Sequence, residues 1–494
     1  MAIKKLKVDF PGKDLFIDLF GDQVYLVGGT VRDCLLYKKI TSSQDIDLVV
    51  VNSSYQAIEK KLRRHGKTNT VGRSFAVVKF SYQGNTVDIA VPRRDRKKEA
   101  AGHGHTNFTI ESGPQVTLEE DLSRRDFTCN SIALRLQDDV LVDPFRGVAA
   151  IRNQRIIMTS PESFADDPLR VLRSARFASV HGFSISNDIY RQAKSIPLNE
   201  LSAERISDEL FRLLLESTDP ARGLGEYLRL TVLEKLYPEL AALATTIQDA
   251  HFHPERDEQG HHTVWAHTLI TVSIAKKLAA RFTLSEEQTL ALLLAALLHD
   301  AGKATTTRWE FKRERMSITS MFHDSVGVRV SQEILDRLRV ETRKNYPLRK
   351  TVLNLIQQHH RLYELYRNRQ AISFKAITRI VKDMAEEDFL LVLLDFADRR
   401  SRHATPLAFR GLDAISRWFL AQKDKYQVNR DTIAPLILGR HLLALGVAPG
   451  VAMGRMLKDM YDRQLNGEFK TREDGLAIVS RSLRSLAGKP KHTR

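Results

Sequence analysis

Two carboxylates follow a glycine turn near the start of the chain, in the stretch VGGTVRDCLLYKKITSSQDIDLV at 27–49. Asp45 and Asp47 are two positions apart in an apolar run, and side chains at this spacing point to the same face of a β-strand. Two adjacent carboxylates repel each other unless a cation lies between them. Mg²⁺ prefers oxygen ligands and usually takes one or two carboxylates together with substrate phosphates. The pair therefore predicts a magnesium site that handles a phosphate compound.

A phosphate-binding turn precedes this pair. Gly28 and Gly29 end an apolar run, and glycines let the backbone approach a phosphate closely. A helix that starts near Thr30 would direct its N-terminus toward the same phosphate. Asp88, in the run VDIAV, could supply a further carboxylate from another strand. A plain turn or an exposed strand edge explains either feature alone, but their combination and order favour a metal-and-triphosphate site.

A second group of metal-ligand side chains lies in the C-terminal half. Imidazole and carboxylate ligands suit transition metals. A lone buried histidine is usually a satisfied core residue, whereas an ordered series favours an intact metal site. The series is His267, His299 with Asp300, His323, His359 or His360, and Asp398 or Asp395.

Bulk properties narrow the class of protein. The net charge of +16 favours contact with polyanions, nucleic acid ahead of a membrane surface, with a solubilising surface as the alternative. The longest apolar run, 290–298, is too short for a membrane span, and the start MAIKKLKVDF lacks the apolar segment of a signal peptide. With only Cys34 and Cys129, neither a disulfide framework nor a thiolate zinc site is implied, and we expect a cytoplasmic protein.

The elements that must position the first site are expected to be strands. The β-branched runs bounded by turn residues are VYLVGG, DIDLVVV, SFAVVKF and NTVDIAV, with a helix at SSYQAIEKKLRRHG that ends at Gly66. The segment 93–106 is polar, contains glycines and has no periodicity, which predicts a mobile loop.

From about residue 161 the pattern is helical nearly throughout. One helix is expected to stop at Gly182, another to begin at Ser202, and a third has Ser285 and Gln288 at capping-box spacing. The polar segment 251–263 predicts a boundary, after which helices are expected to continue to about residue 402.

The motifs around the first site resemble a known superfamily. LVGGTVRD at 26–33 with DIDLVV, and LSRRDFTCNSIAL at 122–134, resemble the nucleotidyltransferases. With DPFRG at 143–147, DDPLRVLRSARFA at 166–178 and AERISDEL at 203–210, the order is similar to class II tRNA nucleotidyltransferases and bacterial poly(A) polymerases. The tail GRHLLALGVAPGVAMGRMLKDMYDRQLNGEFKTRED also resembles that family, so the resemblance covers most of the chain.

The resemblance implies roles for single residues. Asp45 and Asp47 would hold Mg²⁺ for in-line attack of an RNA 3′-hydroxyl on a nucleotide α-phosphate, with Asp88 as a third carboxylate. Asp167 and Arg170, an acceptor and a forked donor three positions apart on a helix, would read an edge of C or of A without a template. The other nucleotide-binding positions would be Gly28, Gly29, Arg32, Arg125, Asp126, Asn130 and Arg173.

The chain departs from the family pattern at a few places. Asp166 stands where the family usually has Glu, Tyr37 where it has Gly, and Ala149 with Ala150 replaces a more acidic pattern. No catalytic group is lost, but the nucleotide preference stays open, with the loop 93–106 as a candidate switch. Arg205 and Glu209 are expected to support the base-reading helix structurally.

The second series resembles an HD-domain phosphohydrolase, through HTLITVSIAKKL, LLHDAGK, FHDSVGVRV, LIQQHH and LLDFADRR. The resemblance implies one or two transition-metal ions, such as Mn²⁺ or Ni²⁺. Hydrolysis of phosphoesters, such as 2′,3′-cyclic or 3′-phosphate ends of damaged RNA, would follow. The implied ligands are His267, His299, Asp300, His323, His359 and Asp398, with His360 and Asp395 as alternatives for the last two.

Basic residues interleaved with tyrosines surround the second series. They would either grip an RNA backbone, with the tyrosines as stacking faces, or form a solvated helix surface. The residues are Arg343, Lys344, Arg361, Arg367, Arg369, Arg399, Arg400 and Arg402, with Tyr346, Tyr363 and Tyr366. The family resemblance adds tRNA contact through the tail, 428–485.

The expected fold class is α+β. A nucleotidyltransferase head with a small mixed β-sheet and helices precedes an all-α body that includes an HD helical bundle. The expected domains are a catalytic head at 1–150, a helical base-recognition neck at 151–250, an HD domain at 260–405 and a helical tRNA-contacting region at 406–494.

The expected function is template-independent addition of CCA, or part of it, to tRNA 3′ ends from CTP and ATP, with release of pyrophosphate. A poly(A) polymerase is the alternative in the same class. An HD phosphohydrolase whose head only binds nucleotide, and a non-catalytic RNA-binding protein, are alternatives that the intact acidic and arginine motifs disfavour. The ppGpp synthetase/hydrolases have the reverse domain order. The expected partners are the tRNA 3′ end, ATP and CTP, without a membrane; the oligomeric state stays open.

Overall fold

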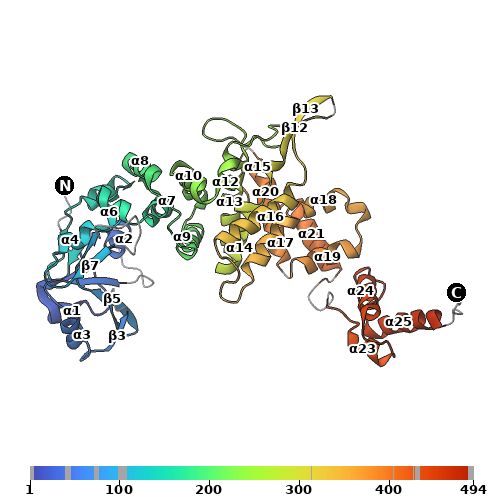
Figure 1. Cartoon of the computed structure of the whole chain (residues 1–494), viewed down its shortest axis with the longest axis horizontal. Coiled ribbons are helices and arrows are strands. Elements are labelled where there is room, and N and C mark those ends of the chain that lie inside the picture. The colour runs from blue at the N-terminus through green and yellow to red at the C-terminus, as the bar shows by residue number, and fades with distance from the viewer. Residues whose placement is uncertain are drawn as a thin grey trace. The chain divides into compact units, whose positions relative to one another are not determined.

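The computed structural model describes residues 5–38, 46–71, 77–97, 108–312, 314–385, 387–403, 405–426, 428 and 434–487. The chain divides into two compact units, Met1–Ala241 and Ala242–Arg494. The first holds the sheet and the helices coloured blue to green in Figure 1, and the second holds the helices coloured green to red. Each candidate site lies within one unit.

A mixed sheet forms the centre of the first unit. Its strands in spatial order are β3 (Lys67–Val71), β4 (Val77–Tyr82), β5 (Asn85–Ala90), β2 (Ile46–Val50), β1 (Val24–Val27), β8 (Ala133–Arg135) and β9 (Val140–Val142). Only β2 and β5 pair in parallel; the other neighbours are antiparallel. The four expected strands are therefore confirmed, and β2 and β5 carry one predicted carboxylate each in this described region.

Helices pack against the sheet, and the N-terminus of one of them, α2, lies at the first site. They are α1 (Lys13–Phe20), α2 (Gly29–Tyr37) and α3 (Tyr55–Leu62), followed by α4 (Leu118–Ser123) with a capping box between Thr117 and Glu120. Helix α2 begins at Gly29, as expected for a phosphate-directed N-terminus. Helix α3 ends four residues before Gly66, earlier than the sequence predicted.

A two-stranded ribbon corrects part of the expected loop at 93–106. β6 (Arg93–Lys97) pairs antiparallel with β7 (Phe108–Ser112). The polar residues RRDRK form a strand because they pair in register with β7, a contact between separate segments that local turn propensity cannot reveal. Residues 98–106 lie outside the described residues.

The rest of the first unit is helical. It contains α5 (Gly147–Arg152), α6 (Pro161–Asp166), α7 (Leu169–His181), α8 (Asn187–Ser195), α9 (Ala203–Glu216), α10 (Pro220–Arg229), α11 (Val232–Leu236) and α12 (Pro238–Ala241), with a short parallel pair β10 (Arg155–Ile156) and β11 (Ser184–Ile185). Gly182 ends α7 in a left-handed conformation, and the Ser202 hydroxyl accepts from the backbone N–H of Arg205 at the start of α9. Both expected helix boundaries are confirmed.

The second unit is a helical body. Its helices are α13 (Val264–Arg281), α14 (Glu286–Leu298), α15 (Lys303–Thr306), α16 (His323–Arg337), α17 (Leu348–Gln358), α18 (Arg361–Arg367), α19 (Phe374–Asp383), α20 (Asp388–Ser401) and α21 (Ala414–Lys425). Helix α14 is buried along its apolar run and packs against α13, α17 and α20. Ser285 and Gln288 form the expected capping box at its start.

The C-terminal helices pack around an apolar cluster of their own. They are α23 (Gly439–Ala444), α24 (Val451–Leu465) and α25 (Arg472–Ala487), and the cluster includes Leu442, Met460 and Phe469. Throughout the described part of the chain, no helix combines the length and the apolar character needed to cross a membrane.

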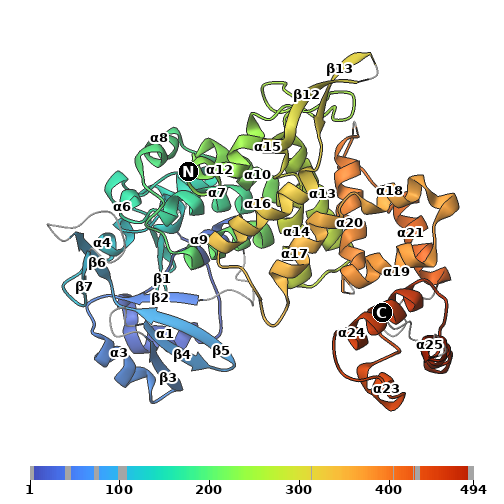
Figure 2. The ribbon, with the colours of Figure 1, turned by 45° about the vertical axis from the view of Figure 1, so that its right-hand side comes forward.

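A β-hairpin interrupts the helices where the sequence predicted none. β12 (Thr307–Lys312) and β13 (Arg315–Ser320) pair antiparallel between α15 and α16. Figures 1 and 2 both show this hairpin extending from the helical body. The segment TRWEFK alternates with period two, which favours a strand over a helix. The expected fold class, a mixed-sheet head before a helical body, is confirmed with this insertion.

Candidate active site and candidate metal centre

An open pocket of about 1010 Å³ lies in the first unit, among the N-terminus of α2, the segment 125–130, and helices α7 and α9. Its lining holds eight arginines and five carboxylates, an excess of positive charge that suits a triphosphate. The predicted residues that line it are Gly28, Gly29, Arg32, Asp47, Arg125, Asp126, Asn130, Asp167, Arg170 and Arg173. Of the remaining predictions, Asp88 is not part of this lining and Asp45 lies outside the described residues.

The pairing of β2 with β5 places two carboxylates side by side. Asp47 and Asp88 are direct register partners across this parallel pair, so their side chains leave the sheet on the same face. Asp88 is also the register partner of Lys79 on β4, and its carboxylate forms an ion pair with the Lys79 ammonium at 3.0 Å. Asp47 is exposed toward the pocket. The carboxylate of Asp47 therefore faces the space where a triphosphate would lie, whereas that of Asp88 is held by Lys79.

The glycine turn before α2 has a backbone that only glycine adopts readily. Gly28 has φ 73° and ψ −137°. Its N–H donates to the carbonyl of Ile132, the residue before β8, at 3.3 Å. A Cβ built on Gly28 would lie 2.7 Å from an Nη of Arg125, closer than such contacts occur. The turn therefore brings the backbone and the Arg125 guanidinium against each other at the pocket wall.

We expect Gly28→Ala to lower kcat/KM for nucleotide addition about ten- to a hundredfold, because the methyl group displaces Arg125 and the turn. Steady-state addition of ATP and CTP to a tRNA acceptor measures the effect. Gly84→Ala is the matched control, since Gly84 also has a positive φ of 78° but its Cβ would meet nothing within 4 Å. Equal losses in both variants would mean that backbone strain alone, rather than the pocket wall, explains the effect.

A chain of hydrogen bonds fixes the RRDxTxN segment. Asp126 is buried and accepts from Asn130 at 2.9 Å, from the backbone N–H of Phe127 at 2.8 Å and from Arg173 of α7 at 2.6 Å. Asn130 in turn accepts from Arg32 of α2 at 2.7 Å. Burial raises the pKa of Asp126, but the Arg173 guanidinium and the Asn130 hydrogen bond outweigh it and lower the pKa to about 2. Asp126 thereby positions two arginines, Arg32 and Arg173, at the pocket.

The two residues expected to read the base lie in different surroundings from those predicted. Asp167 precedes α7 rather than lying in it, and its carboxylate accepts from the Arg205 guanidinium of α9 at 2.9 and 3.0 Å. Arg170 donates to the backbone carbonyl of Arg124 at 2.6 Å and to that of Ser163. The backbone N–H of Arg170 donates to the carbonyl of Asp167 at 2.9 Å, so the two residues lie one turn apart across Pro168, the N-cap of α7, while their side chains have these other partners.

Sequence reasoning missed two features of this pocket. Arg205 was expected only to support the helix, yet it holds the Asp167 carboxylate and lines the pocket. The ring of Phe177 in α7 lies under three guanidinium groups, those of Arg32, Arg173 and Arg176, at 5.0, 5.3 and 4.5 Å from its centroid. Cation–π contact of this kind keeps several like charges together at one wall. The spacing R-x-x-R-F was visible in the sequence, but not the third arginine from α2.

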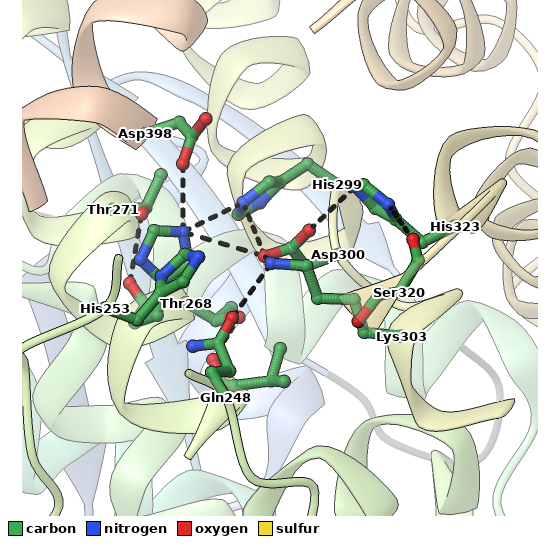
Figure 3. Close-up of polar contacts among 12 residues, drawn as sticks. Gln248, His253, Thr268, Thr271, His299, Asp300, Lys303, Ser320, His323 and Asp398 are labelled. Atoms are coloured by element: carbon green, nitrogen blue, oxygen red, sulfur yellow. Dashed lines mark hydrogen bonds and ion pairs between the residues drawn. The ribbon is translucent and has the colours of Figure 1, made fainter. Parts of the chain in front are cut away.

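The second site gathers histidines and aspartates that lie in, or directly after, five helices of the second unit: α13, α14, α16, α17 and α20. His267 of α13 lies with its Nε2 atom 3.0 Å from Asp398 of α20 and 3.4 Å from the Nε2 of His299. Asp300, at the end of α14, lies 3.3 Å from the Nε2 of His299 and 3.5 Å from that of His323. Figure 3 shows Asp398, His299, Asp300 and His323 turned toward a common centre, with Lys303 beside Asp300.

Both members of the ambiguous histidine pair lie near this centre. One nitrogen atom from each of His323, His359 and His360 lies within 4.8 Å of the others, and the same holds for a nitrogen of His267, a nitrogen of His299 and a carboxylate oxygen of Asp398. Asp398, not Asp395, faces the histidines: Asp395 forms an ion pair with Arg399 at 2.6 Å. Burial raises the pKa of Asp395 to about 6 despite that arginine. These two groups of candidate ligand atoms are compatible with the one or two ions that the sequence suggested.

The histidine tautomers fit a bound transition metal. The Nδ1 atom of His299 lies 2.9 Å from the carbonyl oxygen of Ala296, and those of His323 and His359 lie 2.7 and 2.6 Å from carbonyls one turn earlier. An Nδ1–H donated to a carbonyl leaves Nε2 as the unprotonated ligand atom. The buried Nε2 of His359 has no hydrogen-bond partner within the described structure, which an ion would supply.

A carboxylate that the sequence analysis passed over orients the first histidine. Glu255, in the segment that was expected only to mark a boundary, accepts from the Nδ1 atoms of His267 and His253 at 2.7 and 2.9 Å. Burial raises the pKa of Glu255, but these hydrogen bonds outweigh it and hold the pKa at about 2. The sequence did contain a signal for this role: the string HFHPE at 251–255 places two histidines and a glutamate shortly before α13, the helix that carries His267. Glu255 is a positioning residue for His267.

We expect Glu255→Gln to weaken binding of Mn²⁺ or Ni²⁺ about ten- to a hundredfold while leaving nucleotide addition unchanged. A neutral amide no longer strengthens His267 as a ligand, although the side chain keeps its size. Isothermal titration of the metal-stripped protein with each ion measures the affinity. Glu258→Gln, an exposed change in the same segment, is the control. Unchanged affinity would exclude the positioning role.

Several basic residues around the second site have internal partners. Arg343 and Lys344 form ion pairs with Glu286, Arg399 with Asp395, and Arg402 with Asp398 at 2.7 Å. Arg400 donates to backbone carbonyls of the segment that follows α20. For these residues, local contacts within the protein explain the side-chain positions, and an RNA backbone is not needed to explain them. Tyr363 is exposed, and the Arg367 guanidinium lies 6.0 Å from the centroid of its ring.

The comparisons with known proteins match both sites. A family model described as "Poly A polymerase head domain" matches residues 24–157, and one described as "HD domain" matches residues 264–403. A multifunctional CCA protein of Xylella fastidiosa is 38% identical over 323 residues, which are 64% of this chain and 70% of that protein. One of Stenotrophomonas maltophilia is 36% identical over 350 residues, 69% of this chain and 78% of that protein.

A solved structure supports the fold. The Thermotoga maritima CCA-adding enzyme, solved as a complex with tRNA, superposes with a TM-score of 0.57 at 20% sequence identity, over 98% of this chain and 100% of that one. At this identity the likeness shows the fold alone, while the curated relatives show the family. The chain, with its nucleotidyltransferase head and its histidine–aspartate bundle, therefore belongs to the family of the multifunctional CCA proteins, class II tRNA nucleotidyltransferases that carry an HD domain.

Proposed function

We propose that this chain adds CCA to the 3′ ends of tRNA from CTP and ATP, without a nucleic-acid template and with release of pyrophosphate. The single observation that carries the proposal is the pocket of the first unit, where a carboxylate on a strand, a glycine turn and a cluster of arginines meet in the order of the family's motifs. We place the activity in the cytoplasm, where tRNA ends are processed. The domain limits given above remain predictions.

The reaction breaks the bond between the α- and β-phosphates and forms one between the RNA 3′-oxygen and the α-phosphate. Asp47 would hold Mg²⁺ together with Asp45, since carboxylate oxygens at a triphosphate are the ligands that this ion prefers. Bound Mg²⁺ supplies neutralisation of the phosphate charge and a lower pKa for the attacking hydroxyl. The proton of the 3′-hydroxyl leaves as the bond forms, and pyrophosphate takes the electron pair of the broken bond.

The protein's own residues hold the triphosphate in place. The backbone of Gly28 and Gly29 approaches it closely, while Arg32 and Arg173 stabilise its charge from positions that Asn130 and Asp126 fix. These side chains already have their positions without the substrate, so little free energy is spent on reorienting them when the triphosphate binds. Asp88 is a weaker candidate for the metal, because Lys79 already neutralises its carboxylate.

Base selection is assigned to the surface formed by Asp167, Arg170 and Arg205. A carboxylate accepts from an exocyclic amine, which both C and A present, whereas a guanidinium donates to a ring nitrogen or a carbonyl oxygen. Arg205 orients the Asp167 carboxylate, so the pocket can present an acceptor and a donor on one edge without pairing to a template base. Selection of C and A over U and G then follows from hydrogen-bond complementarity.

A second activity is supported by the metal centre of the second unit. We infer a metal-dependent phosphohydrolase that acts on 2′,3′-cyclic or 3′-phosphate ends of RNA. The support is the grouping of four histidines with Asp300 and Asp398, whose nitrogen and oxygen donors are of the types that transition metals take. Bound Mn²⁺ or Ni²⁺ supplies a nucleophilic hydroxide at neutral pH. Lys303 and Arg402, both beside the aspartates, supply positive charge for a phosphate in the adjoining cavity.

The test of the main activity is nucleotide addition at one-nucleotide resolution. A tRNA that ends at its discriminator base, after C, or after CC is offered CTP, ATP or both with Mg²⁺. A product that stops at CCA when both nucleotides are present would establish a full CCA-adding enzyme. A stop at CC, or action on the CC-ended tRNA alone, would establish a partial enzyme. Long A tails would favour a poly(A) polymerase, and no addition would refute the proposal.

A further inference from the structure

An exposed aromatic face leads into the cavity beside the metal centre. On the β12–β13 hairpin, Trp309 pairs in register with Ile318, and Phe311 pairs with Met316. Side chains two positions apart share a face, so these four lie together on one side of the hairpin. Trp309 is 65% exposed, Phe311 71% and Met316 55%, within an otherwise polar surface segment. An exposed apolar face of this kind on a two-stranded insertion indicates a binding surface.

The same face is continuous with a cavity at the metal centre. Ile318 and Ser320, the next positions along that side of β13, line a cavity of about 260 Å³. His323, His360, Lys303 and Arg402 line it as well. Phe252, 57% exposed, forms part of the same lining from the segment before α13. Three aromatic rings thus mark a path from the tip of the hairpin to the histidines.

The charge around this path favours an anionic occupant. Arg308 and Arg315 are exposed on the opposite face of the hairpin, where Arg308 pairs with Glu310 at 3.1 Å, so the cations on the path itself are those at the cavity end. The cavity end carries Lys303 and Arg402. Exposed aromatic faces that lead to a cationic site are a pattern by which proteins hold unpaired nucleotides, because every base can stack and every phosphate carries charge.

A second protein molecule is a poorer fit for the same face. A stable protein interface needs about 800 Å² and some twenty residues on each partner. The hairpin offers three strongly exposed apolar side chains on two six-residue strands. Its apolar face is also directed along the path to the metal centre, a position that a protein partner has no reason to share.

We propose that the apolar face of the hairpin, with Phe252, is a docking platform for the unpaired 3′-terminal nucleotides of an RNA. Trp309 and Phe311 stack on the bases that precede the terminal one, and Phe252 stacks at the mouth of the cavity. The terminal phosphate then reaches the histidines and Lys303. This inference rests on the proposed phosphohydrolase activity and deepens it: the preferred substrate is a single-stranded RNA end rather than a free mononucleotide.

The test compares a mononucleotide with an oligonucleotide. In the full-length protein loaded with Mn²⁺ or Ni²⁺, Trp309→Ala with Phe311→Ala should raise KM for a five-nucleotide RNA with a 2′,3′-cyclic phosphate end at least about tenfold. Hydrolysis of 2′,3′-cyclic AMP should stay unchanged, because the mononucleotide does not reach the hairpin. The double variant Trp309→Phe with Phe311→Tyr keeps both aromatic faces and should behave as the wild type.

A binding measurement separates this proposal from the phosphohydrolase itself. Fluorescence anisotropy of the same labelled RNA, with an uncleavable 3′-phosphate end, should show the same tenfold weakening in the alanine variant even if the protein hydrolyses neither substrate. Equal losses for the mononucleotide and the RNA would overturn the platform and assign the hairpin to the metal centre. Unchanged RNA binding together with a change in oligomeric state on light scattering would overturn it in favour of self-association.

Discussion

Asp47→Asn should lower the rate of nucleotide addition by about three orders of magnitude or more and leave the metal centre of the second unit intact. Removing one carboxylate from a metal-and-triphosphate site forfeits several kcal/mol of transition-state stabilisation, and each 1.4 kcal/mol is about tenfold in rate. The Asp47 side chain is exposed at the pocket and does not pack in the core of the first unit. The variant should therefore fold normally, with KM for the nucleotides changed less than kcat.

Two comparisons sharpen this result. Asp138→Asn removes a carboxylate that pairs with Arg135 in the turn between β8 and β9, outside the pocket, and should leave addition unchanged. Asp88→Asn tests the third carboxylate, whose ion pair with Lys79 predicts a smaller loss than that of Asp47→Asn. A loss in Asp88→Asn as large as in Asp47→Asn would assign Asp88 to the metal after all. Full activity of Asp47→Asn would show that the first unit has been misassigned.

His299→Ala together with Asp300→Ala should abolish transition-metal binding in the second unit and with it all phosphohydrolase activity, while nucleotide addition persists. His299 and Asp300 each contact other groups of the centre within 3.6 Å, so their loss removes the middle of the ligand set. Metal content of the purified protein and hydrolysis of 2′,3′-cyclic AMP are the measurements. Joint loss of both activities, from this pair or from Asp47→Asn, would contradict the division into two sites.

Folding is the control that this variant needs. Asp300 is buried beside Lys303, whose ammonium lies 2.8 Å from it, and an unpaired buried cation destabilises a protein by about 3–5 kcal/mol. Thermal unfolding should therefore accompany the assay, with His299→Asn as a milder variant that leaves this ion pair in place. Asp395→Asn is the matched control on α20: Asp395 lies one turn before Asp398 but pairs with Arg399 instead of the histidines. It should retain the metal.

Local chemistry explains why the nucleotidyltransferase half was readable from the sequence. The glycine turn, the short strands and the capped helices depend on neighbouring residues, because backbone freedom at Gly28, pleating along β2 and the Ser202 cap act over four residues or fewer. The order of the motifs identified the family, and with it the pocket residues from Gly28 to Arg173. Ten of the predicted nucleotide- and metal-binding residues line one pocket.

Longer-range packing decided what the sequence left open. Asp398 rather than Asp395 faces the metal centre because α13 brings His267 against one side of α20, while Asp395 pairs with Arg399, whose guanidinium also binds Asp413. Positions three apart on a helix are too close in angle for a pattern to choose between them. Glu255 reaches His267 across a segment without periodicity.

The base-reading surface and the hairpin also depend on packing that the sequence does not reveal. The family resemblance placed Asp167 and Arg170 together on a helix as readers of the base, but Asp167 precedes α7 and its carboxylate is held by Arg205 of α9, 38 positions away. The hairpin at 307–320 lay inside a stretch assigned to helices, and its strand pairing appears only when β12 and β13 meet. The sequence by itself determined the family, the fold class and the ligand types. Tertiary structure decided which carboxylate meets which cation, because those distances depend on how separate elements pack.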